Sequence, residues 1–273
     1  MTDKYALIGS PIYHSKSPMI HGEFARSCEQ DITYTTIETS HEDFSRTIFR
    51  FRESGGRGMN VTAPFKVTAM DLATERCKRA ELAGAANTLK FVDGNIVADN
   101  FDGVGLVRDI ESNLGIKLSG RRVLILGAGG AARGAIQPCL ERAPCELMIA
   151  NRTIAKAVAL ATAASALGRV VGCSDSALAG ERFDVIINAT SASLRNEQPA
   201  VPACVFTPDS LAYDLVYGKG LTPFLAMARS LGVKHLADGC GMLVEQAAEA
   251  FLWWRGVRPD TRCLIKKLKT PLL

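Results

Sequence analysis

The sequence predicts an α/β protein in which a mixed α/β unit precedes a doubly wound, mostly parallel sheet. Three observations lead to this prediction. The chain of 273 residues is long enough for about two domains of ordinary size. After residue 103, short apolar runs alternate regularly with helical segments, as buried parallel strands alternate with their crossover helices. One of these apolar runs leads directly into a glycine-rich turn that begins a helix.

The composition is that of an ordinary folded protein. Hydrophobic residues make up 47% of the chain and charged residues 22%, with 24 Gly and 11 Pro, which excludes a disordered or collagen-like chain. The longest apolar stretch, residues 123–132, is interrupted by glycines and is well short of the about 18 residues that span a bilayer. The N-terminus carries an acidic residue and no basic, apolar leader. We therefore expect a cytoplasmic protein without membrane contact.

Cysteines and basic residues give two further expectations. The eight cysteines are scattered, without a Cys-x-x-Cys pair or a histidine at ligand spacing, so we expect reduced thiols and no bound metal.

The net charge is +4, with basic residues concentrated in the segment 255–269. That segment lacks interleaved aromatic residues, and Leu264, Ile265 and Leu268 recur at helical spacing. It therefore indicates a helix with a solvated face rather than a nucleic-acid-binding tail.

The first hundred residues predict strands and amphipathic helices in alternation. Strands are expected at residues 5–8, 31–37, 87–91 and 95–98. The last two are joined through Asp93-Gly94, which is typical of a tight hairpin turn. Ser17 is an expected N-cap of the first helix, with Pro18 in the first helical position.

Three more helices are expected before the regular alternation begins. One starts near Ser40 and Asp43, because Phe44 and Ile48 begin an apolar spacing of three and four, and it ends at the following Gly-Gly pair. Another follows Pro64, and a third covers residues 104–113.

The second half of the chain predicts the doubly wound sheet. Apolar runs indicate buried parallel strands at residues 122–126 and 146–150, and further strands of the same sheet are expected at residues 184–189, 211–216 and 233–237. Helices separate these runs, including one that begins near Thr153. A last long helix over residues 242–254 is expected to pack outside this alternation.

A glycine turn between the first of these strands and its helix indicates a nucleotide site. Gly127-Ala-Gly-Gly-Ala-Ala132 fits the pattern G-x-G-x-x-A in the required strand–turn–helix context. Gly127 allows the tight turn, Gly129 lets backbone N–H groups approach a pyrophosphate, and Ala132 lets the helix pack closely on the strand. A glycine-rich turn without a ligand is the alternative.

The end of the second strand of this sheet favours NADP over NAD. NAD-binding sheets usually have an Asp or Glu there, which binds the ribose hydroxyls. This chain has Asn151-Arg152-Thr153 instead. A guanidinium stacks on adenine and pairs with a 2′-phosphate, so Arg152 predicts NADP, unless it is only a surface residue.

A hydride-transfer enzyme also needs a proton donor for the oxygen that it reduces. With no metal expected, side chains must supply it. Lys66, Asn87 and Asp102 are the candidates at turns or strand ends of the first half. A lysine beside an aspartate is oriented by it, and the two titrate as a coupled pair.

Taken together, these residues resemble the shikimate dehydrogenase family, which interconverts 3-dehydroshikimate and shikimate with NADP. The resemblance runs almost from end to end. It lies in the segments 9–18 (GSPIYHSKSP), 60–66 (NVTAPFK), 84–88 (GAANT), 100–103 (NFDG), 127–132, 151–153, 188–191 (NATS), 213–217 (YDLVY), 222–224 (TPF) and 239–248 (GCGMLVEQAA).

The resemblance implies roles for individual positions. Lys66 and Asp102 are the implied catalytic pair, with Lys66 passing the proton. The implied substrate residues are Ser15, Ser17 and Tyr217 at the carboxylate, and Thr62, Asn87, Asp102 and Gln246 at the ring hydroxyls. The implied cofactor residues are Gly127, Ala128, Gly129, Gly130, Ala131, Asn151, Arg152, Thr153, Thr190, Ser191, Val216, Gly239 and Met242. Each polar residue also has a plain alternative, such as a helix cap or a satisfied core position.

The resemblance also implies an organisation. Residues 1–102 and 240–273 are expected to form the substrate-binding domain, and residues 103–239 an inserted Rossmann-type NADP-binding domain. The C-terminal helices then return to the first domain, and the site lies between the two. The partners expected are the small-molecule substrate and NADP, in a monomer or homodimer. Alternatives are a paralogue that oxidises quinate or a related hydroxy acid, and a non-catalytic NADP-binding sensor of the same fold.

Three positions depart from the family pattern. Tyr13 stands where Gly is usual, and Gly22 stands where Asn is usual after His21. Phe101 replaces a small hydroxyl residue directly before Asp102. If its ring points into the cleft it crowds a polar substrate and removes a hydrogen-bond partner, and if it points into the core nothing changes. On the first reading, shikimate turnover is expected to be less efficient than usual.

Overall fold

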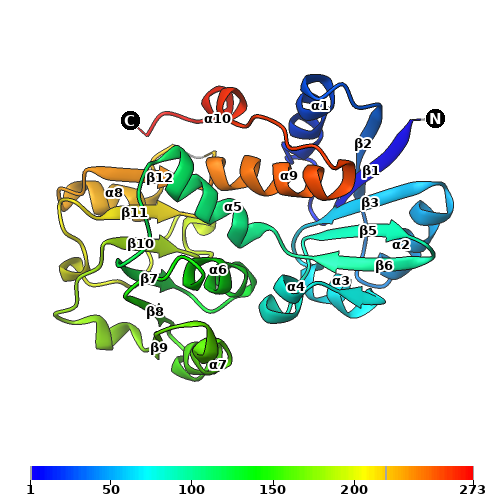
Figure 1. Ribbon diagram of the computed structural model, residues 1–273. Coiled ribbons are helices and arrows are strands. Elements are labelled where there is room, and N and C mark those ends of the chain that lie inside the picture. The colour runs from blue at the N-terminus through cyan, green and yellow to red at the C-terminus, as the bar shows by residue number, and fades with distance from the viewer. Residues whose placement is uncertain (1, 219, 273) are drawn as a thin grey trace.

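The computed structural model describes residues 2–218 and 220–272 and contains two six-stranded sheets. The sheets lie side by side, and the long C-terminal helix α9 (Cys240–Arg255) spans both of them (Figure 1). The mixed α/β class expected from the sequence is confirmed.

The first sheet is mixed, in the order β2-β1-β3-β5-β6-β4. Its strands are β1 (Asp3–Gly9), β2 (Ile32–Glu38), β3 (Gly56–Val61), β4 (Glu75–Arg76), β5 (Thr88–Val92) and β6 (Asn95–Asp99). Strand β1 pairs in parallel with β2 and β3, whereas β5 is antiparallel to β3 and β6. The expected hairpin is present, since both Asp93 (φ 49°) and Gly94 (φ 81°) adopt the left-handed conformation that its turn requires.

Helices α1 (Ser17–Ser27), α2 (Phe44–Glu53), α3 (Lys66–Leu72) and α4 (Lys78–Ala83) accompany this sheet. Phe44 and Ile48 of α2 are buried with Ile8 and Phe65 in one apolar cluster, as their spacing predicts. The expected N-cap of α1 is wrong by one position. Ser17 is the first helical residue, and the Ser15 hydroxyl accepts the Ser17 backbone N–H at 3.2 Å.

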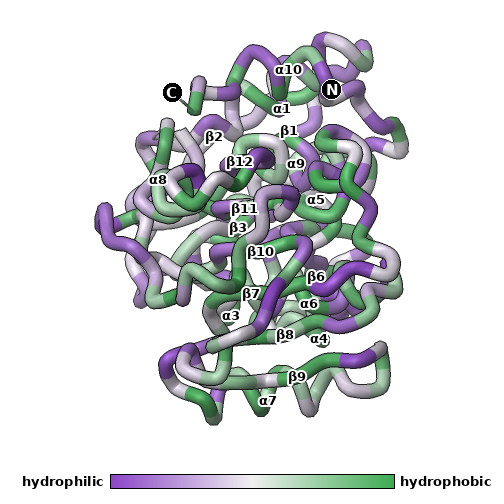
Figure 2. The backbone as a smooth tube through the Cα atoms, turned by 90° about the vertical axis from the view of Figure 1, so that its left-hand side faces the viewer, coloured by the Kyte–Doolittle hydropathy of each residue, from purple (hydrophilic) through white to green (hydrophobic). Residues whose placement is uncertain are grey.

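The second sheet is entirely parallel, in the order β12-β11-β10-β7-β8-β9. Its strands are β7 (Arg122–Leu126), β8 (Glu146–Ala150), β9 (Val170–Cys173), β10 (Val185–Asn188), β11 (Leu211–Asp214) and β12 (His235–Asp238), with helices α6 (Gly130–Leu140), α7 (Ile154–Ala164) and α8 (Pro223–Ser230). In Figure 2 the central strands β7 and β10 are mostly hydrophobic, apart from Arg122 at the start of β7 and Asn188 at the end of β10. Apolar clusters cover both faces of the sheet, which is why these strands read as unbroken apolar runs.

Two helices connect the sheets. Helix α5 (Asp102–Arg108) continues through a π-helical turn (Asp109–Asn113) into the second sheet, and α9 returns along it. Helix α5 packs on its neighbours through glycines. A Cβ atom on Gly103 would overlap the carbonyl oxygen of Gly134 in α6, and one on Gly105 would lie 2.6 Å from the backbone nitrogen of Gln246 in α9. Only glycine permits such close backbone contact.

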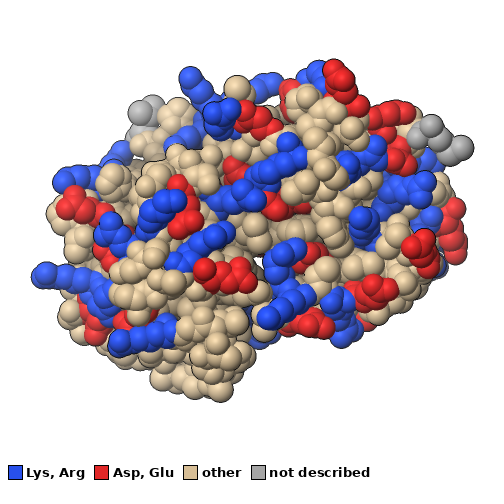
Figure 3. All heavy atoms as spheres, in the orientation of Figure 1, with Lys and Arg blue, Asp and Glu red and all other residues tan. Residues whose placement is uncertain are grey.

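The basic C-terminal segment forms helix α10 (Arg262–Leu268), whose Leu264 is buried beside α1 and α9. Four of the basic side chains in residues 255–269 are paired: Arg255 with Asp3, Arg258 with Glu245 and Glu249, Arg262 with Asp260, and Lys267 with Glu23. Positive and negative side chains are interspersed over the face shown in Figure 3. Within the described parts of the chain, no helix is both long and apolar enough to cross a membrane.

Candidate active site

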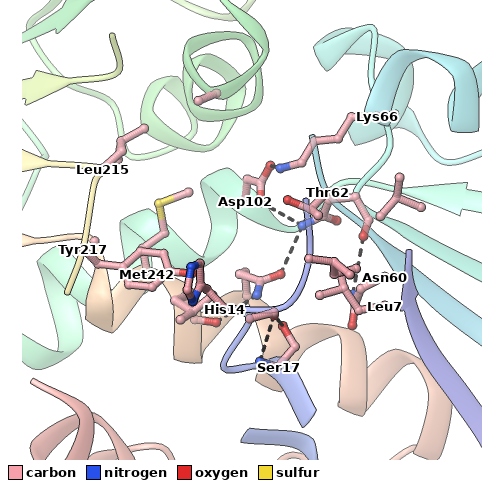
Figure 4. A pocket seen from close by; sticks show the side chains of 18 of the residues that line it. Leu7, His14, Ser17, Asn60, Thr62, Lys66, Asp102, Leu215, Tyr217 and Met242 are labelled. Carbon is pink, nitrogen blue, oxygen red and sulfur yellow. Dashed lines mark hydrogen bonds and ion pairs between the residues drawn. The ribbon is translucent and has the colours of Figure 1, made fainter. Parts of the chain in front are cut away.

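A cavity of about 360 Å³ lies where the two sheets and α9 meet. Its wall includes Asn60 and Thr62 at the carboxyl end of β3, Tyr217 after β11, and Gln246 of α9. Figure 4 shows Asn60 and Thr62 on one side of the cavity and Tyr217 on the other, with Asp102 between them. The volume is typical of a small-molecule site.

Lys66 and Asp102 form an ion pair inside this cavity. The Nζ atom of Lys66 lies 2.5 Å from Oδ2 of Asp102, and the side chains are 28% and 10% exposed. Lys66 begins α3 and Asp102 begins α5. The Asn100 side-chain oxygen accepts the Asp102 backbone N–H at 3.1 Å, so the start of α5 is held in place by its own loop. The ammonium is oriented, partly exposed to the cavity, and available for proton transfer.

Asn87 connects this pair with α9. Its Nδ2 atom donates to Oδ1 of Asp102 at 2.9 Å and to Oε1 of Gln246 at 3.2 Å. Gln246 in turn donates from Nε2 to the carbonyl oxygen of Leu243 in its own helix. The sequence predicts all four side chains as site residues, and the structure brings them together in one hydrogen-bonded group.

The opposite end of the cavity presents hydroxyl groups. Ser15 Oγ and Ser17 Oγ are 3.2 Å apart and both line the cavity. Because α1 begins at Ser17, the hydroxyl of Ser17 is not used as a cap and faces the cavity instead. Tyr217 lies across from them, with Lys16 Nζ 5.9 Å from its ring centroid, and burial raises the pKa of its phenol.

Two polar residues of the cavity wall were not predicted individually. Asn60 is 5% exposed and lies two residues before Thr62, so the two share a face of the extended chain. His14 lies between Tyr217 and Ser17 in Figure 4. The alternation along β3 was the signal available for Asn60, whereas His14 gave none beyond its place beside Ser15. In the described residues no group of three or more His, Cys, Asp or Glu side chains is arranged to hold a metal ion.

The glycine turn has the shape that a dinucleotide needs. Gly127 has φ 103°, a conformation that favours glycine, and a Cβ atom there would approach Ala189 and Thr190 to 3.2–3.3 Å. Cβ atoms on Gly129 and Gly130 would meet nothing within 4 Å, so the backbone before α6 is open to a ligand. Ala128 is buried beneath the turn, and Ala131 lines the cavity. The start of α6 therefore fits a pyrophosphate.

The segment after β8 fits a 2′-phosphate. Asn151 donates from Nδ2 to the carbonyl oxygen of Thr153, which shapes the turn, and Arg152 is exposed. The carboxylate that interacts with the charge of Arg152 is that of Asp175, beyond β9. Burial raises the pKa of Asp175, and the charge of Arg152 reduces this rise. No acidic residue occupies the end of β8 itself, so the position that binds the ribose hydroxyls in NAD-binding sheets carries no carboxylate here.

The remaining expected cofactor residues follow the ends of neighbouring strands. Thr190 donates its hydroxyl to Asn188, and Ser191 accepts from Arg195, in the loop after β10. Val216 is buried after β11, and the backbone N–H of Gly239 donates to its carbonyl oxygen at 3.3 Å. Gly239 and Met242 both line the cavity. These strand ends lie at the same edge of a parallel sheet, where ligands bind.

Phe101 points away from the cavity. Its ring is 3% exposed, packs with Tyr5, Ala250 and Trp254, and lies 5.7 Å from the Trp253 ring. The reading in which Phe101 crowds the substrate is therefore wrong. Asp102 faces the cavity, whereas the side chain of the residue before it, Phe101, faces the core. The Phe101 ring therefore fills space in the core and takes no part in contacts with the substrate.

Comparisons with known proteins match this geometry. Family models match residues 7–89 (shikimate dehydrogenase substrate binding domain), 109–198 (shikimate/quinate 5-dehydrogenase) and 239–269 (shikimate 5′-dehydrogenase C-terminal domain). A curated relative from Chromobacterium violaceum, named shikimate dehydrogenase (NADP(+)), is 54% identical over 272 residues and 100% of both chains. The chain belongs to the shikimate dehydrogenase family.

Solved structures match the whole architecture of the chain. An Ael1 enzyme from Pseudomonas putida is 57% identical, covers 100% of both chains and has a TM-score of 0.96. A shikimate 5-dehydrogenase from Thermus thermophilus, in complex with NADP(H) and shikimate, is 30% identical, covers 97% of this chain and 98% of its own, and has a TM-score of 0.85.

Proposed function

We propose that this chain is an NADP-dependent shikimate dehydrogenase, an oxidoreductase that catalyses the reversible reduction of 3-dehydroshikimate to shikimate. The observation that carries the proposal is the Lys66–Asp102 pair, hydrogen-bonded to Asn87, in a cavity that adjoins an open glycine turn. Full-length relatives from Chromobacterium violaceum and Nitrosospira multiformis carry this name at 54% and 52% identity.

The polar groups of the cavity divide into two sets that suit the two ends of such a substrate. Ser15, Ser17 and Tyr217 offer three hydroxyl donors to the carboxylate. The Thr62 hydroxyl and the carboxamides of Asn87 and Gln246 line the other side and bind the ring hydroxyls, which both donate and accept.

Lys66 carries the proton. In the oxidation direction Lys66, as the neutral amine, takes the proton from the hydroxyl oxygen while the hydride leaves the reacting carbon. In the reduction direction the ammonium returns that proton to the oxygen. Asp102 Oδ2 lies 2.5 Å from Nζ of Lys66 and orients it. Asp102 also accepts a hydrogen bond from a second hydroxyl group of the ring. NADP, when bound, supplies the acceptor or donor of the hydride.

The glycine turn and the strand ends hold the cofactor. The backbone from Gly127 to Ala131 receives the pyrophosphate at the start of α6. Asn151, Arg152 and Thr153 receive the adenosine end, where the guanidinium pairs with the 2′-phosphate. Thr190, Ser191, Val216, Gly239 and Met242 surround the reacting end.

We further propose that residues 1–102 and 240–273 form one domain and residues 103–239 the other, with the site between them. The enzyme acts as a monomer or homodimer in the cytoplasm, without a membrane or nucleic-acid partner. The packing of α9 against α1, in which Ile20 and Phe24 share one apolar cluster with Val244 and Phe251, supports this division.

The test is the initial rate of NADPH or NADH formation with shikimate and with quinate, each measured with NADP and with NAD. We expect shikimate with NADP to give the highest kcat/KM. A preference for quinate would redirect the substrate assignment to a related hydroxy acid. Binding of NADP without turnover of either acid would contradict the enzyme assignment and favour a sensor.

A further inference from the structure

A chain of hydrogen bonds runs from β2 to Asp102. Tyr34 Oη donates to Asn60 Oδ1 at 2.7 Å, and Asn60 Nδ2 donates to Thr88 Oγ1 at 3.1 Å. The Thr88 hydroxyl donates to Asn87 Oδ1 at 2.9 Å, and Asn87 Nδ2 donates to Asp102 Oδ1 at 2.9 Å. Every link therefore donates in one direction, toward the carboxylate.

The direction of the chain follows from the chemistry of its two ends. The carboxylate of Asp102, paired with Lys66, only accepts. Asn87 Oδ1 also accepts the backbone N–H of Phe101 at 2.9 Å, so the Asn87 NH₂ group has to face the cavity. At the other end, burial raises the pKa of Tyr34 well above its ordinary value, and the phenol keeps its proton.

The distal end of the chain is held by packing. The imidazole of His21 stacks on the Tyr34 ring at 4.2 Å with an interplanar angle of 7°. His21 is fully buried, and burial lowers its pKa to about 3, so the stack is between neutral rings. Thr88 is also fully buried and Asn60 is 5% exposed. These hydroxyl and amide groups therefore have little access to water and depend on each other for partners.

We propose that Tyr34, Asn60 and Thr88 are positioning residues for the reaction. They act through Asn87, whose amide they fix with its NH₂ group toward Asp102, and they strengthen that donor by aligned polarisation along the chain. The inference rests on the proposed function, because it concerns the alignment of the same catalytic pair.

Replacement of Thr88 provides the sharpest test, because Val has nearly the same shape without the hydroxyl. Thr88→Val removes the donor to Asn87 and the acceptor for Asn60 together. We expect kcat for shikimate oxidation to fall about tenfold, which corresponds to about 1.4 kcal/mol, while KM for NADP stays unchanged. Thr88→Ser keeps the hydroxyl and should restore kcat. If Thr88 mattered only for stability, both variants would have a lower melting temperature, and kcat would not fall in Thr88→Val and recover in Thr88→Ser.

The first link has a matched control on the neighbouring strand. Tyr34→Phe should lower kcat about threefold, since it removes one donor at a distance from the pair. Tyr5 is paired in register with Tyr34 on β1, is 3% exposed and stacks on Trp254 at 4.6 Å. Tyr5→Phe removes a buried hydroxyl outside the chain and should leave kcat unchanged.

A second readout does not depend on turnover. In protein labelled with ¹⁵N-asparagine, the Asn87 side-chain NH₂ resonances can be assigned by their loss in Asn87→Asp. We expect slow hydrogen exchange at this group in the wild type and in Thr88→Ser, and at least about tenfold faster exchange in Thr88→Val, in line with about 1.4 kcal/mol of lost protection.

The positioning role is overturned if Thr88→Val keeps both wild-type kcat and slow exchange, or if Thr88→Ser loses as much as Thr88→Val. If the wild type oxidises neither shikimate nor quinate, the proposed function fails, and the exchange measurement still decides whether the chain fixes Asn87.

Discussion

Replacing Lys66 with Ala removes the only lysine or arginine among the described residues that line the cavity. Its Nζ atom lies 2.5 Å from Asp102, and no other lysine of residues 2–218 and 220–272 lines the cavity. A positioned general acid–base group contributes a factor of about 10² to 10⁴. We therefore expect kcat for shikimate oxidation to fall about 10³-fold, equivalent to about 4 kcal/mol of transition-state stabilisation.

The same change affects the partner of Lys66. In Lys66→Ala the Asp102 side chain, which is largely buried, keeps only the Asn87 amide, among the described residues, as a side-chain hydrogen-bond donor. Lys66→Arg separates this charge effect from proton transfer, since a guanidinium keeps the ion pair but does not give up its proton at ordinary pH. We expect Lys66→Arg to lose nearly as much kcat as Lys66→Ala, with a smaller change in KM for shikimate.

The assay is NADPH absorbance at saturating shikimate and NADP, together with the dissociation constant for NADP. Lys90 provides a control, because its ammonium donates to the carbonyl oxygen of Trp253 and does not line the cavity. Lys90→Ala should keep wild-type kcat. A Lys66→Ala variant that retains kcat within about threefold, less than the smallest general-acid effect, refutes the assignment of Lys66 as the proton carrier.

Three further predictions concern the cofactor, the core and acid stability. Arg152→Ala should raise KM for NADP about tenfold or more and leave KM for NAD unchanged, because only NADP carries the phosphate; equal effects on both would place Arg152 outside the phosphate site. Phe101→Thr should lower the free energy of unfolding by about 3 kcal/mol in urea titrations and leave kcat and KM unchanged. Faster turnover by the variant than by the wild type would show that the Phe101 ring faces the cavity and crowds the substrate. Burial holds the pKa of His21 near 3 in the folded protein, so the unfolded chain binds the extra proton below about pH 6.5, and at pH 5 folding should lose about 2 kcal/mol relative to pH 7. His21→Phe should abolish that part of the loss, and an unchanged pH dependence would contradict it.

The sequence predicted the second sheet more completely than the first. The bounds of β7 and β8 agree with the expected apolar runs because both faces of these strands are buried. Strand β9 was not expected. It is an edge strand of four residues, and it contains Gly172, where a Cβ atom would overlap the backbone of Ala157 in α7. That contact between α7 and β9 has no sequence pattern of its own.

The site was predictable where a motif is local and not where the fold joins distant segments. The glycine turn and the segment 60–66 are continuous in sequence. The hydrogen bond from Tyr34 to Asn60 joins β2 to β3 past the strand β1 that lies between them, and Asn87 meets Gln246 across 159 positions. Whether Phe101 faced the core depended on Ala250 and Trp254, which reach it only because α9 returns to the first sheet. Local pattern does not encode such contacts.

The glycines of α5 set a spacing that side chains elsewhere cannot alter. Asp102 begins this helix, and its backbone lies directly against α6, which starts at the glycine turn, and α9, which carries Gln246. The contact of backbone against backbone at Gly103 and Gly105 therefore limits the distance between the Lys66–Asp102 pair and the glycine turn. Substitutions at the rim of the cavity can therefore change which substrate ring binds without moving Asp102 relative to the glycine turn.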